Sequence, residues 1–166
     1  MSDPSPPSVS LFVTCLADLI RPSVAFASIR LLEQAGCIVD VPVQQTCCGQ
    51  PGYNSGDYES TVPIAKKTIA LFEHAQFVVA PSGSCAGMLT EHYPKLLEGE
   101  WQERAIALAE KTYELTSFLA DVVKLDKAPA ILTQMPTVTY HDSCAGLREL
   151  GIKEQPRKLL RELCEV

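Results

Sequence analysis

Cysteine is the residue type in this sequence best suited to do chemistry, because the chain of 166 residues contains seven of them. Cys15 is separated by 31 residues from the adjacent pair Cys47-Cys48, and that pair is separated by 36 residues from Cys85. An odd number of cysteines in a chain without a secretory signal argues against a disulfide framework and favours metal binding or redox chemistry. Because thiolates are the usual ligands of iron–sulfur clusters, this pattern is typical of a cluster site.

The pair Cys47-Cys48 lies in a turn-rich stretch, Gln44–Gly56, which predicts an irregular loop. Two adjacent cysteines cannot share one face of a helix or strand, but in such a loop both side chains can turn toward one cluster. The glycines of this stretch would let the backbone pass close to it. Helices are expected to begin after Cys15, Cys85 and Cys144, and their N-termini would favour the thiolate over the thiol.

Apolar runs and helical periodicity alternate along the chain, and they predict the elements that position these cysteines. Four strands are expected, over Ser8–Cys15, Cys37–Val43, Gln76–Pro81 and Thr137–His141. Helices are expected over Pro22–Ala35, Tyr58–His74 and Trp101–Tyr113, in a stretch ending at Val123, and over about Pro156–Cys164. This alternation predicts an α/β fold with a mostly parallel sheet and flanking helices. Since most of the cysteines follow predicted strands, we expect them to converge at the carboxyl edge of the sheet.

A strand followed by a cysteine occurs at Cys15 and again at Cys144, which suggests an internal repeat. Leu31-Leu32 follows the first cysteine at nearly the same distance as Leu159-Leu160 follows the second. The second copy stops before any counterpart of Cys47-Cys48. The sequence therefore predicts a flexible tail at 1–7, a first cysteine-rich unit at 8–123, a connector at 124–136 and the truncated start of a second unit at 137–166.

Composition and charge exclude several classes of function. The chain has 14 basic and 20 acidic residues, a formal net charge of −6, and no cluster of Lys or Arg, which argues against binding to nucleic acid or to an anionic membrane. No apolar run approaches the roughly 20 residues that a membrane-spanning helix needs. The first residues lack the basic start and the apolar middle of a signal peptide, so a cytoplasmic location is expected.

Five strings of the sequence together resemble the cysteine-rich CCG domain family. They are FVTC ending at Cys15, QQTCCGQPGYNSG over Gln44–Gly56, PSGSC ending at Cys85, LTSFL over Leu115–Leu119, and YHDSCAGLRELGIKEQPRKLL over Tyr140–Leu160. Members of this family include the iron–sulfur proteins of lactate utilization, of glycolate oxidation and of anaerobic glycerol-3-phosphate oxidation, and a cysteine-rich component of heterodisulfide reductase. The strings span nearly the whole chain, and they match the lactate utilization branch best.

The resemblance implies a [4Fe–4S] cluster and the relay of electrons during oxidation of L-lactate to pyruvate, in a complex with the other subunits of a lactate utilization system. The metal ligands that it implies are Cys15, Cys47, Cys48 and Cys85, with Cys144 assigned to the second motif. Gly49, Gly83 and Ser84 are the cofactor-binding neighbours that it implies. Met88 stands where the heterodisulfide reductase branch has a further cysteine, which favours a four-thiolate site.

Other interpretations of the same residues stay open. The chain could be a scaffold or interaction module without a cluster, and an incomplete second unit could leave apolar surface that promotes self-association. Cys15 and Arg21 have the spacing of a Cys-x5-Arg phosphatase loop. Four thiolates also suit zinc, and Cys47-Cys48 could form a vicinal disulfide. Cys37 and Cys164 are expected to be buried, unreactive thiols. No acid–base or Ser/His/Asp set is evident, so the chain is not expected to be catalytic alone.

Overall fold

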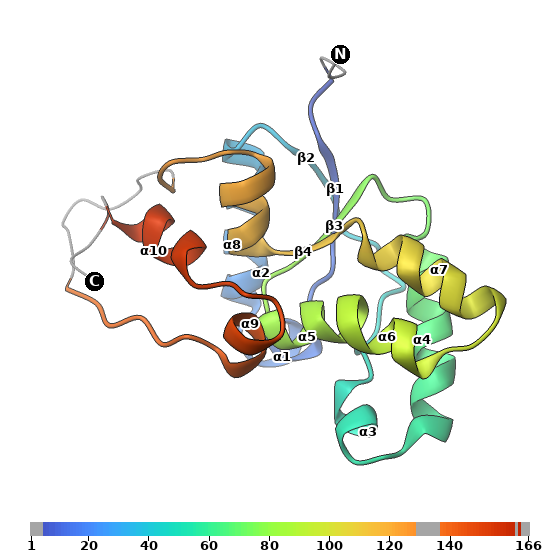
Figure 1. The fold of residues 1–166 in the computed structure, drawn as a ribbon. Coiled ribbons are helices and arrows are strands. Elements are labelled where there is room, and N and C mark those ends of the chain that lie inside the picture. Colours follow the sequence, from blue (N-terminus) through green and yellow to red (C-terminus); the bar gives the residue numbers. More distant parts are fainter. Residues whose placement is uncertain (1–4, 129–136, 162, 164–166) are drawn as a thin grey trace.

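A four-stranded parallel sheet forms the centre of the computed structural model, which describes residues 5–128, 137–161 and 163. Its strands are β1 (Ser8–Leu11), β2 (Ile38–Asp40), β3 (Phe77–Ala80) and β4 (Thr112–Glu114). They lie in the order β2-β1-β3-β4, with Val9 of β1 opposite both Val39 and Phe77 (Figure 1). The predicted α/β fold with flanking helices is therefore confirmed.

Helical segments follow each strand. The first half of the chain contains α1 (Cys15–Ile20), α2 (Pro22–Gln34), α3 (Gln50–Asn54) and α4 (Tyr58–Phe72). After β3 come α5 (Gly83–Gly87), the π-helical turn η1 (Met88–His92), α6 (Tyr93–Leu96) and α7 (Glu100–Ala109). After β4 come α8 (Leu115–Ser117), the π-helical turn η2 (Phe118–Val122), α9 (Cys144–Arg148) and α10 (Glu154–Leu160). Local sequence sets some of these starts, since Pro22 occupies the first position of α2 and the Asp57 side chain accepts a hydrogen bond from the Ser60 N–H at the start of α4.

Helices cover both faces of the sheet, and side chains alternate between the two faces along each strand. On one face, Val78 and Ala80 of β3 pack with α4, with α7 and with the run from α5 to α6. On the other face, Val79 packs with α2, α8 and η2. Because both faces are covered, β3 appears in the sequence as a continuous apolar stretch.

The fourth strand lies elsewhere than the sequence predicts. The helix predicted over Trp101–Tyr113 is too long, because α7 ends at Ala109 and β4 follows. The strand predicted over Thr137–His141 is wrong, since Thr137 makes an isolated bridge and the residues after it have no regular structure before α9. β4 is too short for its alternation to show in the sequence, and pairing with β3 makes it a strand.

Residues 144–160 lie against the rest of the fold, with α9 packed on α5 and α10 packed on α8 and η2 (Figure 1). Arg157 of α10 forms a two-armed ion pair with Asp142, at 2.7 Å for each arm, which fixes the loop before α9. The division into two cysteine-rich units stays a prediction. Cys164 and parts of the predicted tail and connector lie outside the described residues. Within the described ranges, no helix combines the length and the apolar character that crossing a membrane requires.

Candidate functional site

The cysteine-bearing segments meet at the carboxyl ends of β1 and β3, the two central strands of the sheet. The chain leaves β1 toward α2 on one face of the sheet and leaves β3 toward α5 on the other, so a crevice forms between the two exits. Cys15 begins α1 after β1, and Cys85 lies in α5 after β3. The loop that follows β2 brings Cys47-Cys48 to the same crevice.

Four cysteine side chains line one cavity of about 510 Å³. The Sγ atoms of Cys15 and Cys47 lie 3.7 Å apart, and those of Cys48 and Cys85 lie 3.4 Å apart. The second pair is buried and the first is half-buried. Apolar residues contribute much of the remaining wall, among them Leu16, Ala17, Ile20, Val24 and Pro51. The six described cysteines are all free thiols, so the vicinal disulfide between Cys47 and Cys48 is not formed.

The residue after the pair has to be glycine. Gly49 has a φ of +83°, a left-handed backbone conformation that strains residues with a Cβ atom. A Cβ atom at this position would also lie 3.1 Å from the Cγ2 atom of Thr61 in the first turn of α4. The Gly49 N–H donates a hydrogen bond to the Cys47 Sγ atom at 3.4 Å. Backbone geometry, as well as the thiols, therefore accounts for the order Cys-Cys-Gly.

Three side chains that no sequence motif singles out hold this loop. Gln45 bonds to the backbone at the end of β1. The Gln50 side chain donates a hydrogen bond to the Ser84 carbonyl oxygen at 3.2 Å. The fully buried Tyr93 donates from its hydroxyl to the Cys48 carbonyl oxygen at 2.8 Å. Sequence spacing does not reveal these contacts, because their acceptors and donors are main-chain groups far away along the chain.

The two thiols of the buried pair differ in acidity. The pKa of Cys85 is lowered to about 7, because the Cys48 thiol and the hydroxyls of Ser82 and Ser84 donate hydrogen bonds to its sulfur. The same hydrogen bond, together with burial, raises the pKa of Cys48 far above its ordinary range. Burial also raises the pKa of Cys15. Within the buried pair, Cys85 is therefore the thiol that loses its proton first.

Cys144 does not line this cavity but lies exposed in a neighbouring one of about 520 Å³. Hydroxyl and carboxyl groups line that second cavity, from Ser82, Ser84, Glu114, Tyr140, Ser143 and Glu149. The two cavities share a wall at the start of α5, because Ser82 and Ser84 line both. A Cβ atom on Gly83 would lie 2.9 Å from the Gly146 nitrogen of α9, so glycine is needed where the two helix starts meet.

The phosphatase interpretation of Cys15 and Arg21 is not supported, because the residues between them form α1. The main-chain N–H groups of Asp18 and Arg21 donate to carbonyl oxygens within that turn of helix, and a phosphate-binding loop needs such groups free. In the part of the chain that the structure describes, His, Cys, Asp and Glu side chains form no group of three or more placed to hold a single metal ion. The four thiols form two pairs instead.

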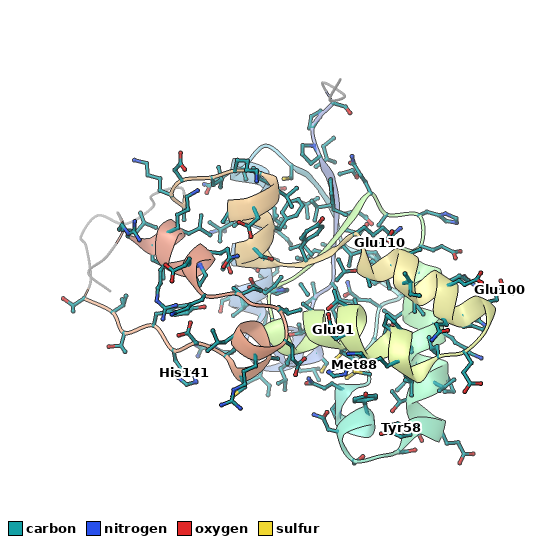
Figure 2. The ribbon with its side chains drawn as sticks, viewed as in Figure 1. Tyr58, Met88, Glu91, Glu100, Glu110 and His141 are labelled. Carbon is teal, nitrogen blue, oxygen red and sulfur yellow. The ribbon has the colours of Figure 1, made fainter. Side chains whose placement is uncertain are left out.

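Residues that the sequence sets apart from the site lie away from the cavity wall. Met88 is fully buried in the core that packs on α4 and α7, and Figure 2 shows it inside the fold. Cys37 is buried in the core on the opposite face of the sheet, as predicted. His141 lies on the outer loop that leads to α9 (Figure 2). These positions agree with structural roles for Met88 and Cys37.

A family model described as a cysteine-rich domain, CCG, matches residues 9–90. This range contains all four cysteines of the cavity and the loop that carries Cys47-Cys48. No solved structure matches the chain.

Curated relatives match almost the whole chain. Lactate utilization protein A of Geobacillus sp. (strain WCH70) is 51% identical over 157 residues, which cover 93% of this chain and 65% of that protein. The protein of the same name from Bacillus licheniformis is 48% identical with the same coverage, and lactate utilization protein A 2 of Bacillus cereus (strain Q1) is 45% identical, covering 93% of this chain and 64% of that protein. The chain thus spans somewhat less than two thirds of the length of these relatives. With the family model matched across the cysteine site and the relatives matched across nearly all of the sequence, the chain belongs to the cysteine-rich CCG domain family.

Proposed function

We propose that this chain is an iron–sulfur electron-transfer subunit that takes part in the oxidation of L-lactate to pyruvate. The observation that carries the proposal is the placement of four free thiols, from three separate segments, around one cavity. Thiolates are the ligands that iron–sulfur clusters use. The names of the relatives, which are lactate utilization proteins, supply the proposed reaction and suggest the other subunits of such a system as partners.

The residues present fit a [4Fe–4S] cluster with Cys15, Cys47, Cys48 and Cys85 as its ligands. Four thiols are available, they form two pairs and not one group around a point, and the cavity that they line is larger than a single ion needs. When bound, such a cluster accepts and donates single electrons. In this proposal Cys144 lies outside the ligand set and serves a second motif.

The residues of the chain itself would hold and shield the cluster. Each thiol must lose its proton to bind metal, and Cys85, with its pKa of about 7, does so more readily than Cys48. Gln50 and Tyr93 fix the loop through main-chain contacts on either side of the paired cysteines. The apolar side chains of the wall limit the access of water, which is a factor in setting the reduction potential of a cluster.

Anaerobic reconstitution with iron and sulfide tests the proposal. We expect iron and sulfide in equal amounts, with the visible absorbance and the EPR signal of a cluster. The double variant Cys47→Ser/Cys48→Ser should retain at least about tenfold less iron, because two of the four ligands are lost. Cys37→Ser is the matched control, since Cys37 is buried on the opposite face of the sheet, and it should bind iron like the parent protein.

Iron uptake that the double variant leaves unchanged would overturn the proposed ligands. A parent protein that takes up no iron would favour a scaffold or interaction module without a cluster. The reaction is tested with the partner subunits present, where L-lactate should reduce the cluster and pyruvate should accumulate. Reduction of the cluster that does not depend on lactate would contradict the proposed substrate.

Self-association stays a separate prediction. Leu16, Leu19 and Ile20 of α1 are 66%, 80% and 67% exposed, which is unusual for three large apolar side chains on one short helix. Burial of these side chains between two copies would favour a dimer. Size-exclusion chromatography with light scattering should show it, and a monomer at all concentrations would count against it.

A further inference from the structure

We propose that Gln45 is a positioning residue that sets the separation of Cys15 from Cys47, an inference that rests on the proposed cluster function. Gln45 lies two residues before Cys47, and Val13 lies two residues before Cys15. The Gln45 side chain joins these two segments directly. Its role is to hold them side by side, and it acts on the ligands through the backbone.

The Gln45 amide bonds to the end of β1 as the backbone of a neighbouring strand would. Its Oε1 atom accepts a hydrogen bond from the Val13 N–H at 2.7 Å, and its Nε2 atom donates to the Leu11 carbonyl oxygen at 3.3 Å. In a parallel sheet, a residue opposite position 12 would donate to the carbonyl of residue 11 and accept from the N–H of residue 13. One side-chain amide therefore reproduces the contacts of a strand residue opposite Phe12.

This substitution is needed because β2 separates from β1 too early to make those contacts. The pairing of β1 with β2 extends only to Ser10 opposite Asp40. On its other side β1 stays paired one residue beyond its end, since the Phe12 N–H donates to the Val79 carbonyl oxygen at 2.8 Å. Gln45 takes the main-chain groups that β2 leaves free, and so it returns the cysteine loop to β1.

A third contact closes the loop behind the glutamine. The Gln45 Nε2 atom also donates to the Pro42 carbonyl oxygen at 3.0 Å, across the turn that follows β2. The side chain is thus tied to three main-chain groups, which resists sliding of the loop along β1. Since Cys15 and Cys47 each lie two residues beyond the bonded positions, this lock keeps their Sγ atoms at 3.7 Å.

The variant Gln45→Glu tests the lock, because a carboxylate has nearly the same size but cannot donate to the two carbonyl oxygens that face it. Gln44→Glu is the matched control, since Gln44 is the exposed neighbour and the change of charge is the same. The probe is dibromobimane, which bridges two nearby thiols, applied to cluster-free protein. Mass spectrometry counts the Cys15–Cys47 and Cys48–Cys85 bridges separately. We expect Gln45→Glu to lower the first bridge about tenfold and to leave the second unchanged.

Unchanged bridging of Cys15 to Cys47 in Gln45→Glu would overturn the proposal. An equal loss of both bridges would also overturn it, because the effect would then be general loosening of the fold. Gln45→Met removes the three hydrogen bonds without adding charge, and it should give the same selective loss even if Gln45→Glu fails to fold.

The bridging measurement does not depend on a bound cluster, so it separates this inference from the proposed function. If the parent protein bound no iron, a selective loss of the Cys15–Cys47 bridge would still support Gln45 as a positioning residue for the thiols. On reconstituted protein, Gln45→Met should bind about tenfold less iron and show an altered EPR signal.

Discussion

The loops around Cys15 and Cys144 begin in the same way. In both, the cysteine is the first residue of a short helix, and the residue before it caps that helix with a side-chain hydroxyl. The oxygen of Thr14 accepts a hydrogen bond from the N–H three residues further on at 3.2 Å, and the oxygen of Ser143 does the same at 3.1 Å. The local sequence therefore builds one cysteine-bearing helix start twice.

The surroundings of the two cysteines differ. Cys15 shares its cavity with three further thiols, two of them buried, whereas Cys144 is exposed among hydroxyl and carboxyl groups. The loop after β2 supplies two of the partners of Cys15, and within the described residues no second cysteine lines the cavity of Cys144. A capped cysteine is thus a local feature, and a thiolate site forms only where other segments of the fold converge on it.

The largest expected effect separates the two cysteines by their iron binding. Cys15→Ser should lower iron uptake on anaerobic reconstitution at least about tenfold, because one of four ligands is lost from a closed set. Cys144→Ser makes the same chemical change behind the same kind of cap, and it should leave uptake unchanged. Equal losses in the two variants would break the comparison and place Cys144 among the ligands.

Alkylation rates should separate exposed from buried thiols in the native, cluster-free protein. Cys144 is exposed, whereas Cys37 is 7% exposed and Cys48 is 2% exposed. We expect iodoacetamide to modify Cys144 at least about tenfold faster than either buried thiol, because these react only when the structure opens. Peptide mass spectrometry over a time course gives the rates, and similar rates at all three positions would contradict the burial described above.

The two helix caps should differ in their contribution to stability. Thr14→Ala should lower the free energy of unfolding by about 1–2 kcal/mol, because Thr14 is buried and its hydroxyl satisfies an N–H there. Ser143→Ala should lower it by only about 0.5 kcal/mol, since Ser143 is exposed and water can replace the hydroxyl. Urea unfolding of both variants measures the difference. A larger loss in Ser143→Ala would reverse the assignment.

The smallest effect is a dependence on pH from the cavity of Cys144. Burial raises the pKa of Glu114, so the unfolded chain gives up this proton more readily than the folded protein does. The free energy of unfolding should therefore fall as pH rises from the ordinary value of 4.5 through the raised pKa. Glu114→Gln should remove this part of the slope in urea titrations at several pH values.

The control for this titration is Glu110→Gln. Glu110 is exposed on the C-terminal side of α7, as Figure 2 shows, and its replacement should leave the slope unchanged. A parent protein and a Glu114→Gln variant with identical slopes would show that Glu114 contributes nothing to the pH dependence. The four cysteines of the first cavity share it with no carboxylate among the described lining residues, so no comparable carboxylate effect is expected there.

The grouping of the four cysteines can be predicted from sequence, since Cys15 and Cys85 follow apolar strands and parallel strands end at one edge. β4 cannot be predicted in this way, because its three residues become a strand only by pairing with β3. The role of Gln45 is hidden for a related reason. Its partners are main-chain groups more than 30 residues away, and main-chain groups leave no trace in residue type.

The same holds for the contact between Gly83 and Gly146. Each glycine looks in the sequence like an ordinary helix or turn residue, and only the packing of α9 on α5 shows why a Cβ atom is excluded. Contacts between distant backbones are thus the part of the site that a single sequence does not predict. They are also what separates the two cavities.

The π-helical turn η1 places a constraint on the length of the chain. Such a turn contains one residue more than the α-helix around it. Because each residue of an α-helix advances by about 100°, deleting one residue from Met88–His92 would rotate all that follows by that angle. Tyr93, which holds the Cys48 carbonyl oxygen, comes directly after the turn and would point elsewhere. We therefore expect this segment to tolerate changes of residue type more readily than the loss of a single position.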